Sequence, residues 1–110
     1  NFSLIENMPG SRIFQLSNAY DMLPVNVIMP EDKEQMALTI NGKKRNIHKK
    51  EFRKLAESYE ISPKAAENML KKICRMENKL LDQVEGAYLS KEQKEQVSQL
   101  VHERIKTLSL

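Results

Sequence analysis

The sequence of 110 residues contains one cysteine, two histidines, three glycines and no tryptophan. A single cysteine excludes an intramolecular disulfide and a zinc site built from cysteines, and two histidines exclude a multi-histidine metal site. The three glycines, Gly10, Gly42 and Gly86, are too scattered for a glycine-rich phosphate loop. No apolar run approaches the ~18 residues of a membrane span, so we expect no membrane segment.

Aromatic residues make up only 5% of the chain, so a core must be built from Leu, Ile, Val, Met and Ala. Apolar residues at 40% and charged residues at 30% are typical of a soluble globular domain. The chain begins at Asn1 rather than Met and shows no signal segment, so we expect a piece of a longer cytoplasmic protein. Cys74 is expected to be a reduced thiol in that compartment.

Charge is distributed unevenly along the chain. Residues 1–42 hold two basic and five acidic residues, a net charge of −3, whereas residues 43–110 hold sixteen basic and ten acidic residues, a net charge of +6. The densest basic run opens the second segment and contains Lys43, Lys44, Arg45, Lys49, Lys50 and Arg53. A solvated surface explains such a run, and contact with nucleic acid or a protein partner is the alternative.

Strand and turn signals dominate the first segment. Short β-prone stretches on either side of Pro9-Gly10 predict a hairpin over about residues 2–17. Asn41-Gly42 fills the two positive-φ positions of a tight turn and predicts a second hairpin over about 35–47. Between them, Pro24 and Pro30 bracket a stretch that we interpret as loop or edge backbone.

Helical periodicity begins at His48 and predicts three helices, over about residues 49–59, 63–85 and 91–108. Ser62-Pro63 is a typical helix start, and Ser90 with Gln93 forms a capping box. The predicted fold is therefore α+β and mostly α, with one or two hairpins packed on three helices.

Residues 52–70 also suggest a helix-turn-helix, in which the second helix would begin near Ile61 and read DNA. Two features count against this interpretation. Tyr59-Glu60 stands where the tight turn usually has a glycine, and the predicted second helix exceeds twenty residues. A basic helix-turn-helix-like module for nucleic-acid or protein binding remains the alternative function.

The start of the chain and the stretch after the first hairpin carry a family resemblance. Asn1-Phe2-Ser3-Leu4, a hairpin and Leu16-Ser17-Asn18-Ala19-Tyr20-Asp21-Met22-Leu23-Pro24 resemble the C-terminal lobe of HipA-type toxin kinases. In that family the catalytic loop ends in an Asn followed by Phe-Ser, and a Tyr-Asp or similar pair after the hairpin supplies a metal-binding Asp. The stretch Met36–Lys43 also looks like the family, and the resemblance spans residues 1 to about 75.

The resemblance implies that Asn1 and Asp21 are the two metal ligands of a kinase. The catalytic base, an Asp five residues before Asn1, lies outside this sequence, so no catalytic residue is expected within it. Use of ATP and Mg²⁺ in serine/threonine phosphorylation is thus expected of the intact parent. The 110 residues alone are expected to be inactive and to carry no cofactor.

The resemblance also implies partners for the parent: a DNA-binding HipB-like antitoxin, and a translation-factor substrate such as an aminoacyl-tRNA synthetase. We predict a hairpin segment at 1–47 and a helical subdomain at 48–110, together forming one truncated kinase C-lobe. Apolar surface left uncovered by the missing lobe predicts self-association of the chain. Asp21 separates the two functions, because a DNA-binding module has no use for an acidic residue there.

Overall fold

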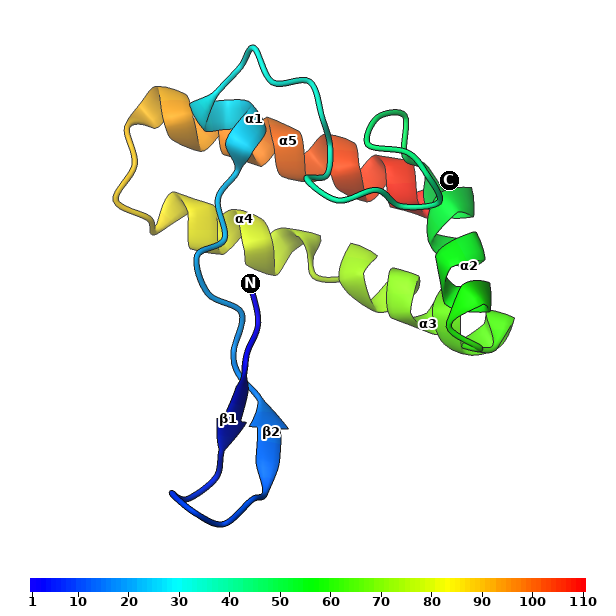
Figure 1. The fold of residues 1–110 in the computed structure, drawn as a ribbon. Coiled ribbons are helices and arrows are strands. Elements are labelled where there is room, and N and C mark those ends of the chain that lie inside the picture. Colours follow the sequence, from blue (N-terminus) through cyan, green and yellow to red (C-terminus); the bar gives the residue numbers. More distant parts are fainter.

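A two-stranded hairpin followed by five helices forms the fold in the computed structural model, which describes residues 1–110 (Figure 1). The elements are β1 (Leu4–Glu6), β2 (Phe14–Leu16), α1 (Val25–Ile28), α2 (Lys49–Ser58), α3 (Pro63–Cys74), α4 (Glu77–Glu85) and α5 (Lys91–Ser109). This confirms the predicted α+β class with a predominance of helix. None of the helices combines the length and apolar character needed to cross a membrane.

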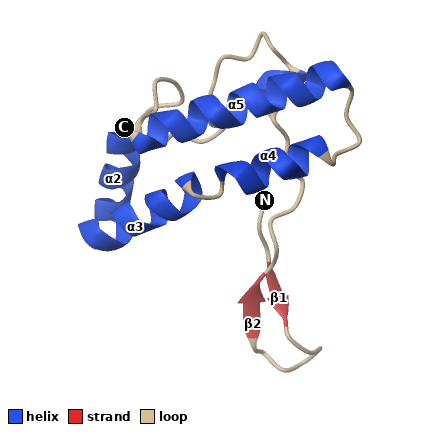
Figure 2. Ribbon diagram, turned by 180° about the vertical axis from the view of Figure 1, so that it is seen from behind, coloured by secondary structure: helices blue, strands red, loops and turns tan.

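The first predicted hairpin is confirmed. β1 and β2 pair antiparallel, with Leu4 opposite Leu16 and Glu6 opposite Phe14. The Glu6 carboxylate closes the turn by accepting hydrogen bonds from the backbone N–H groups of Gly10 and Arg12, at 2.9 and 3.0 Å. The expectation that the hairpin packs on the helices is wrong. All six strand residues are exposed, and the hairpin projects from the helices because no helix in the chain covers its apolar side chains (Figures 1 and 2).

The second predicted hairpin is present as a turn but not as paired strands. Asn41 and Gly42 adopt φ values of 50° and 72°, as a tight hairpin turn requires. A single bridge, Ile40 to Lys43, is the only strand-like pairing there. Side chains replace the ladder, since the Gln35 carbonyl oxygen accepts from the backbone N–H of Ile47 at 2.7 Å. The prediction of strands over 35–47 is therefore wrong.

The predicted helix over 63–85 is divided into α3 and α4. Met76 donates its backbone N–H to the carbonyl of Ile73, three residues back, and this tighter bond interrupts the helix after Cys74. Both halves still pack against α5, which runs antiparallel to them (Figure 1). The other two predicted helices are confirmed as α2 and α5, and the Ser90–Gln93 capping box is present.

The core lies where α2, α3 and α5 meet the loop before α2. The buried apolar residues are Ile40, Ile47, Ala66 and Ile105, and a single charged residue, Glu51, is buried with them. The short helix α1 packs on α5. Most large apolar side chains of residues 1–30 remain exposed, so the hairpin segment contributes little to this core.

Candidate functional site

The base of the hairpin brings the two ends of the N-terminal segment together. The backbone N–H of Ser17 donates to the Ser3 carbonyl at 2.8 Å, and that of Tyr20 donates to the Asn1 carbonyl at 3.2 Å. The Asn1 side-chain amide then donates to the Asp21 carbonyl at 3.4 Å. The two sequence-predicted metal ligands therefore lie next to each other, although nineteen residues separate them.

Residues that the sequence reasoning did not single out hold this base in place. The hydroxyls of Ser3 and Tyr20 share a hydrogen bond of 2.7 Å, and Ser17 Oγ accepts the Ser3 backbone N–H at 2.9 Å. Ser3, Ser17 and Tyr20 all lie within the stretches that carry the family resemblance. Their hydroxyls were the available signal, because Ser3 directly precedes β1, Ser17 directly follows β2 and Tyr20 lies shortly after it.

Asp21 has a left-handed backbone conformation and an exposed side chain without partners in the chain. Its φ of 52° lies in the left-handed region, which Asp tolerates better than most residues. Its carboxylate accepts no hydrogen bond and enters no ion pair, and both Asn1 and Asp21 are exposed. A carboxylate and an amide oxygen are the hard ligands that Mg²⁺ prefers, and Mg²⁺ commonly takes its remaining ligands from water and phosphate.

The protein groups at the base of the hairpin are too few to hold a metal ion by themselves. No cluster of three or more His, Cys, Asp or Glu side chains lies in this structure. The base of the hairpin therefore brings together two residues whose side chains carry oxygen atoms, Asn1 and Asp21, through a hydrogen bond to the Asp21 backbone carbonyl. That number fits Mg²⁺ bound through a nucleotide phosphate, and it does not fit a cation held by the protein alone.

The basic run at residues 43–53 is not a single exposed surface. Lys43 pairs with Glu51 at 2.8 Å and Lys44 pairs with Glu34 at 3.2 Å. Lys49 and Arg53 share Glu67, at 2.6 and 2.9 Å. Of the six residues, Arg45 and Lys50 alone form no ion pair, so most of this charge holds the chain together.

Comparison with protein families decides the affiliation. The model of the HipA-like C-terminal domain matches residues 1–80, nearly three quarters of the chain. The chain belongs to the HipA-like C-terminal domain family. No curated protein matches it. The matched region includes both predicted metal ligands and the helices α2 and α3, whereas α5 lies outside it.

Within this HipA-like domain, Glu51 anchors the loop that precedes α2. Its side chain is 2% exposed and accepts the Lys43 ammonium and the backbone N–H of His48, both at 2.8 Å. The hydrogen bond from Lys43 is the main reason that the pKa of Glu51 falls from 4.5 to about 2. Composition gave no sign that one glutamate of the basic run would be buried.

Glu67 makes the stability of the domain sensitive to acid. Hydrogen bonds from Lys49 and then Arg53 lower its pKa from 4.5 to about 2. A lowered pKa stabilises the folded state fully above about pH 4.5, and this stabilisation is lost as the pH falls toward 2. We expect the urea midpoint to fall across that range, and to fall less steeply in Glu67→Gln. Equal slopes for the two proteins would contradict the assignment.

Proposed function

We propose that this chain is the C-terminal part of a HipA-like serine/threonine kinase of a bacterial toxin–antitoxin system, with Asn1 and Asp21 as its two Mg²⁺ ligands. The observation that carries the proposal is the meeting of these residues at the base of the hairpin, where the Asp21 carboxylate has no partner within the chain. Membership of the HipA-like family supports it.

The proposed division of labour follows from the chemistry of phosphoryl transfer. A kinase must position ATP and stabilise charge on the transferred phosphoryl group, which Mg²⁺ does when it bridges the phosphates. In this chain, Asn1 and Asp21 would orient the metal. The bonds among Ser3, Ser17 and Tyr20 would keep the two ligands at a fixed separation.

The parent would supply what the 110 residues do not contain. By resemblance, the general base is an Asp five residues before Asn1, and the nucleotide-binding Lys belongs to the other lobe. The 110-residue chain alone would therefore transfer no phosphate. A HipB-like antitoxin and a translation-factor substrate such as an aminoacyl-tRNA synthetase are the proposed partners of the parent, and the boundary at residues 47 and 48 stays a prediction.

Metal dependence of phosphate transfer tests this proposal. The full-length parent is incubated with labelled ATP and candidate substrates in Mg²⁺, in excess chelator, and in chelator followed by excess Mg²⁺. We expect transfer in the first and third conditions, none in the second, and none from the 110-residue chain in any. A folded parent that transfers no phosphate with Mg²⁺, or the same amount without it, would refute the kinase assignment.

A basic nucleic-acid-binding module is the alternative function. The short connection between α2 and α3 supports it, because Glu60 takes a φ of 58° where a helix-turn-helix usually has glycine. The ion pairs of Lys43, Lys44, Lys49 and Arg53 count against it. Salt-dependent DNA binding by the chain, lost when Lys43, Lys44 and Arg45 are replaced together, would favour this alternative.

The uncovered hairpin leads to a prediction of self-association. Leu4 and Leu16 face each other across the strands at 70% and 65% exposure, and Phe14 beside them is 58% exposed. We expect sedimentation velocity to show concentration-dependent association of the 110-residue chain. The double variant Leu4→Ser with Leu16→Ser should reduce it, and the control Leu38→Ser, at an 80% exposed site outside the hairpin, should not. A strictly monomeric chain at high concentration would contradict the prediction.

A further inference from the structure

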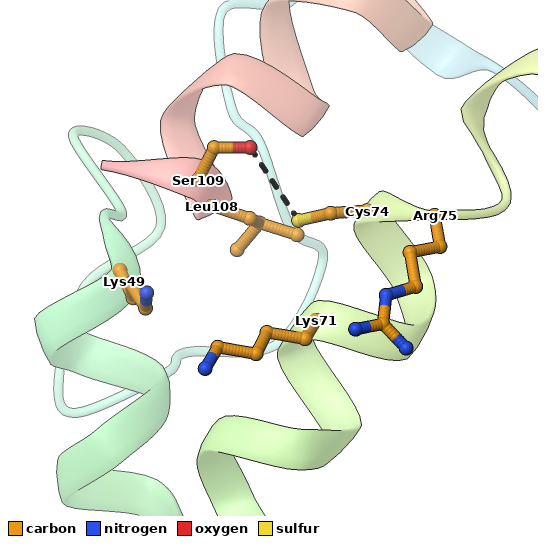
Figure 3. Close-up of a pocket in the computed structure, with 6 residues that line it drawn as sticks. All are labelled: Lys49, Lys71, Cys74, Arg75, Leu108 and Ser109. Atoms are coloured by element: carbon orange, nitrogen blue, oxygen red, sulfur yellow. Dashed lines mark hydrogen bonds between the residues drawn. The ribbon is translucent and has the colours of Figure 1, made fainter.

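A cleft of about 310 Å³ lies where the start of α2 meets the C-terminal ends of α3 and α5. It is lined by Lys49, Lys71, Cys74, Arg75, Leu108 and Ser109 (Figure 3). Three of these six side chains are cationic and none is acidic. Because they come from three helices, only the folded chain assembles them. The volume is at the lower end of the range for small-molecule sites.

Lys71 and Arg75 form a like-charge pair that the chain leaves unbalanced. They stand four residues apart, so they are neighbours on one face of the helix and repel each other. Neither enters an ion pair, and Figure 3 shows both along the same edge of the cleft. The only acidic residue of α3 is Glu67, and its carboxylate is already occupied by Lys49 and Arg53. Glu77, at the start of α4, lies 2.8 Å from His102 instead.

Lys49 adds a third positive charge, which is only partly neutralised. Its side chain is 13% exposed and its ammonium lies 2.6 Å from Glu67 Oε1. Arg53 donates to the same carboxylate at 2.9 Å. The single negative charge of Glu67 is thus shared by two cations, so Lys49, Arg53 and Glu67 together keep a net positive charge beside the cleft.

The C-terminal ends of the helices balance part of this positive charge but not all of it. The C-terminus of a helix carries about −0.5 charge, so the ends of α3 and α5 attract cations. The two helix ends, at about −0.5 each, do not balance the two full positive charges of the unpaired Lys71 and Arg75. The rest of the wall is uncharged. Leu108 is apolar, and the Ser109 hydroxyl donates to the Ile105 carbonyl at 2.8 Å, with Cys74 Sγ 3.6 Å away.

We propose that this cleft binds a phosphate group, either as inorganic phosphate or as a phosphomonoester. Arg75 would supply a two-pronged hydrogen bond and Lys71 a compact charge, which is how these side chains ordinarily bind phosphate. Lys49 would add charge from the α2 side of the cleft. The site is separate from the base of the hairpin, so the proposal does not depend on kinase activity.

A residue-resolved titration tests the proposal. The ¹⁵N-labelled 110-residue chain is titrated with inorganic phosphate and with O-phosphoserine, and sodium chloride keeps the ionic strength constant. We expect saturable shifts at residues 71–76 and 107–110. Lys71→Gln with Arg75→Gln should weaken binding at least about tenfold, since each contact is a charged hydrogen bond. Lys72→Gln with Lys79→Gln removes the same charge outside the cleft and should change affinity less than about twofold.

The outcomes of this titration either support the phosphate site or overturn it. Saturable binding of one probe supports the site and identifies its source, free phosphate or phosphomonoester. Absence of saturable shifts with both probes overturns the proposal. Shifts spread over all basic residues, or equal weakening in the control pair, overturn it as well, because they indicate diffuse charge. If the spectrum shows that the double variant is unfolded, the single variant Arg75→Gln replaces it.

Discussion

Replacing Asp21 with asparagine in the full-length parent is expected to lower phosphate transfer at least about 100-fold. Mutation of residues that only hydrogen-bond to metal ligands typically lowers metal affinity or activity by roughly 10- to 100-fold. Loss of a direct carboxylate ligand should therefore reach the upper end of that range. Asparagine keeps the size of the side chain and its tolerance of the left-handed φ of 52°. The variant therefore removes the charge without disturbing the backbone. Transfer of labelled phosphate from ATP measures the effect.

Glu31→Gln is the matched control for this experiment. Glu31 lies in the same N-terminal segment, is exposed, and has no ion pair or side-chain hydrogen bond, so its loss removes the same charge from a passive position. We expect its transfer rate to stay within about twofold of the wild type. A full rate in Asp21→Asn would remove Asp21 from the metal site, even if the parent is a kinase.

Replacing Glu51 with glutamine is expected to lower the melting temperature of the chain by at least about 5 °C. Glu51 is 2% exposed and accepts two hydrogen bonds, from Lys43 and from the backbone of His48. Glutamine has one acceptor oxygen, and its amide N–H₂ would face a second donor. The main cost is the buried acceptor that glutamine lacks. The Lys43 ammonium would also lose its only counter-charge, but its side chain is 43% exposed, so water replaces part of that interaction. Circular dichroism of the helices during heating measures the change.

Glu57→Gln provides the comparison on the same helix. Glu57 is exposed and has no ion pair, so its replacement should leave the melting temperature nearly unchanged. The gap between wild type and Glu51→Gln should also shrink as the pH falls from 4.5 toward 2, because Glu51 then begins to bind a proton. Identical melting of Glu51→Gln and wild type at pH 7 would show that the buried pair does not hold the loop.

Features governed by neighbouring residues were predicted correctly from the sequence. The Ser90–Gln93 capping box and the Asn41-Gly42 turn depend on groups three residues apart or less, and both are present. The division between α3 and α4 could not be predicted, since apolar residues continue at helical spacing through the break, at Ile73, Met76 and Leu80. The strands expected at 35–47 failed because Gln35 binds Ile47 in place of a partner strand.

The candidate site was accessible to sequence reasoning only through its motif. Asn1 and Asp21 are unremarkable in composition, and without the surrounding family pattern they would be a chain end and a turn residue. The ion pairs of the basic run could not be predicted from the sequence, for a different reason. Glu34, Glu51 and Glu67 lie eight to eighteen residues from their lysine or arginine partners, so a basic run that looks solvated in sequence is largely paired in space.

The projecting hairpin implies that this chain has more than one cooperative unit. No helix covers β1 or β2, and their hydrogen bonds lie among exposed residues, so these strands open at a lower free energy than the helices. The helical part keeps its own small core around Ala66 and Ile105 when they do. Order at the base of the hairpin is therefore a local property, and the opening of the strands also decides how often Asn1 and Asp21 are held together.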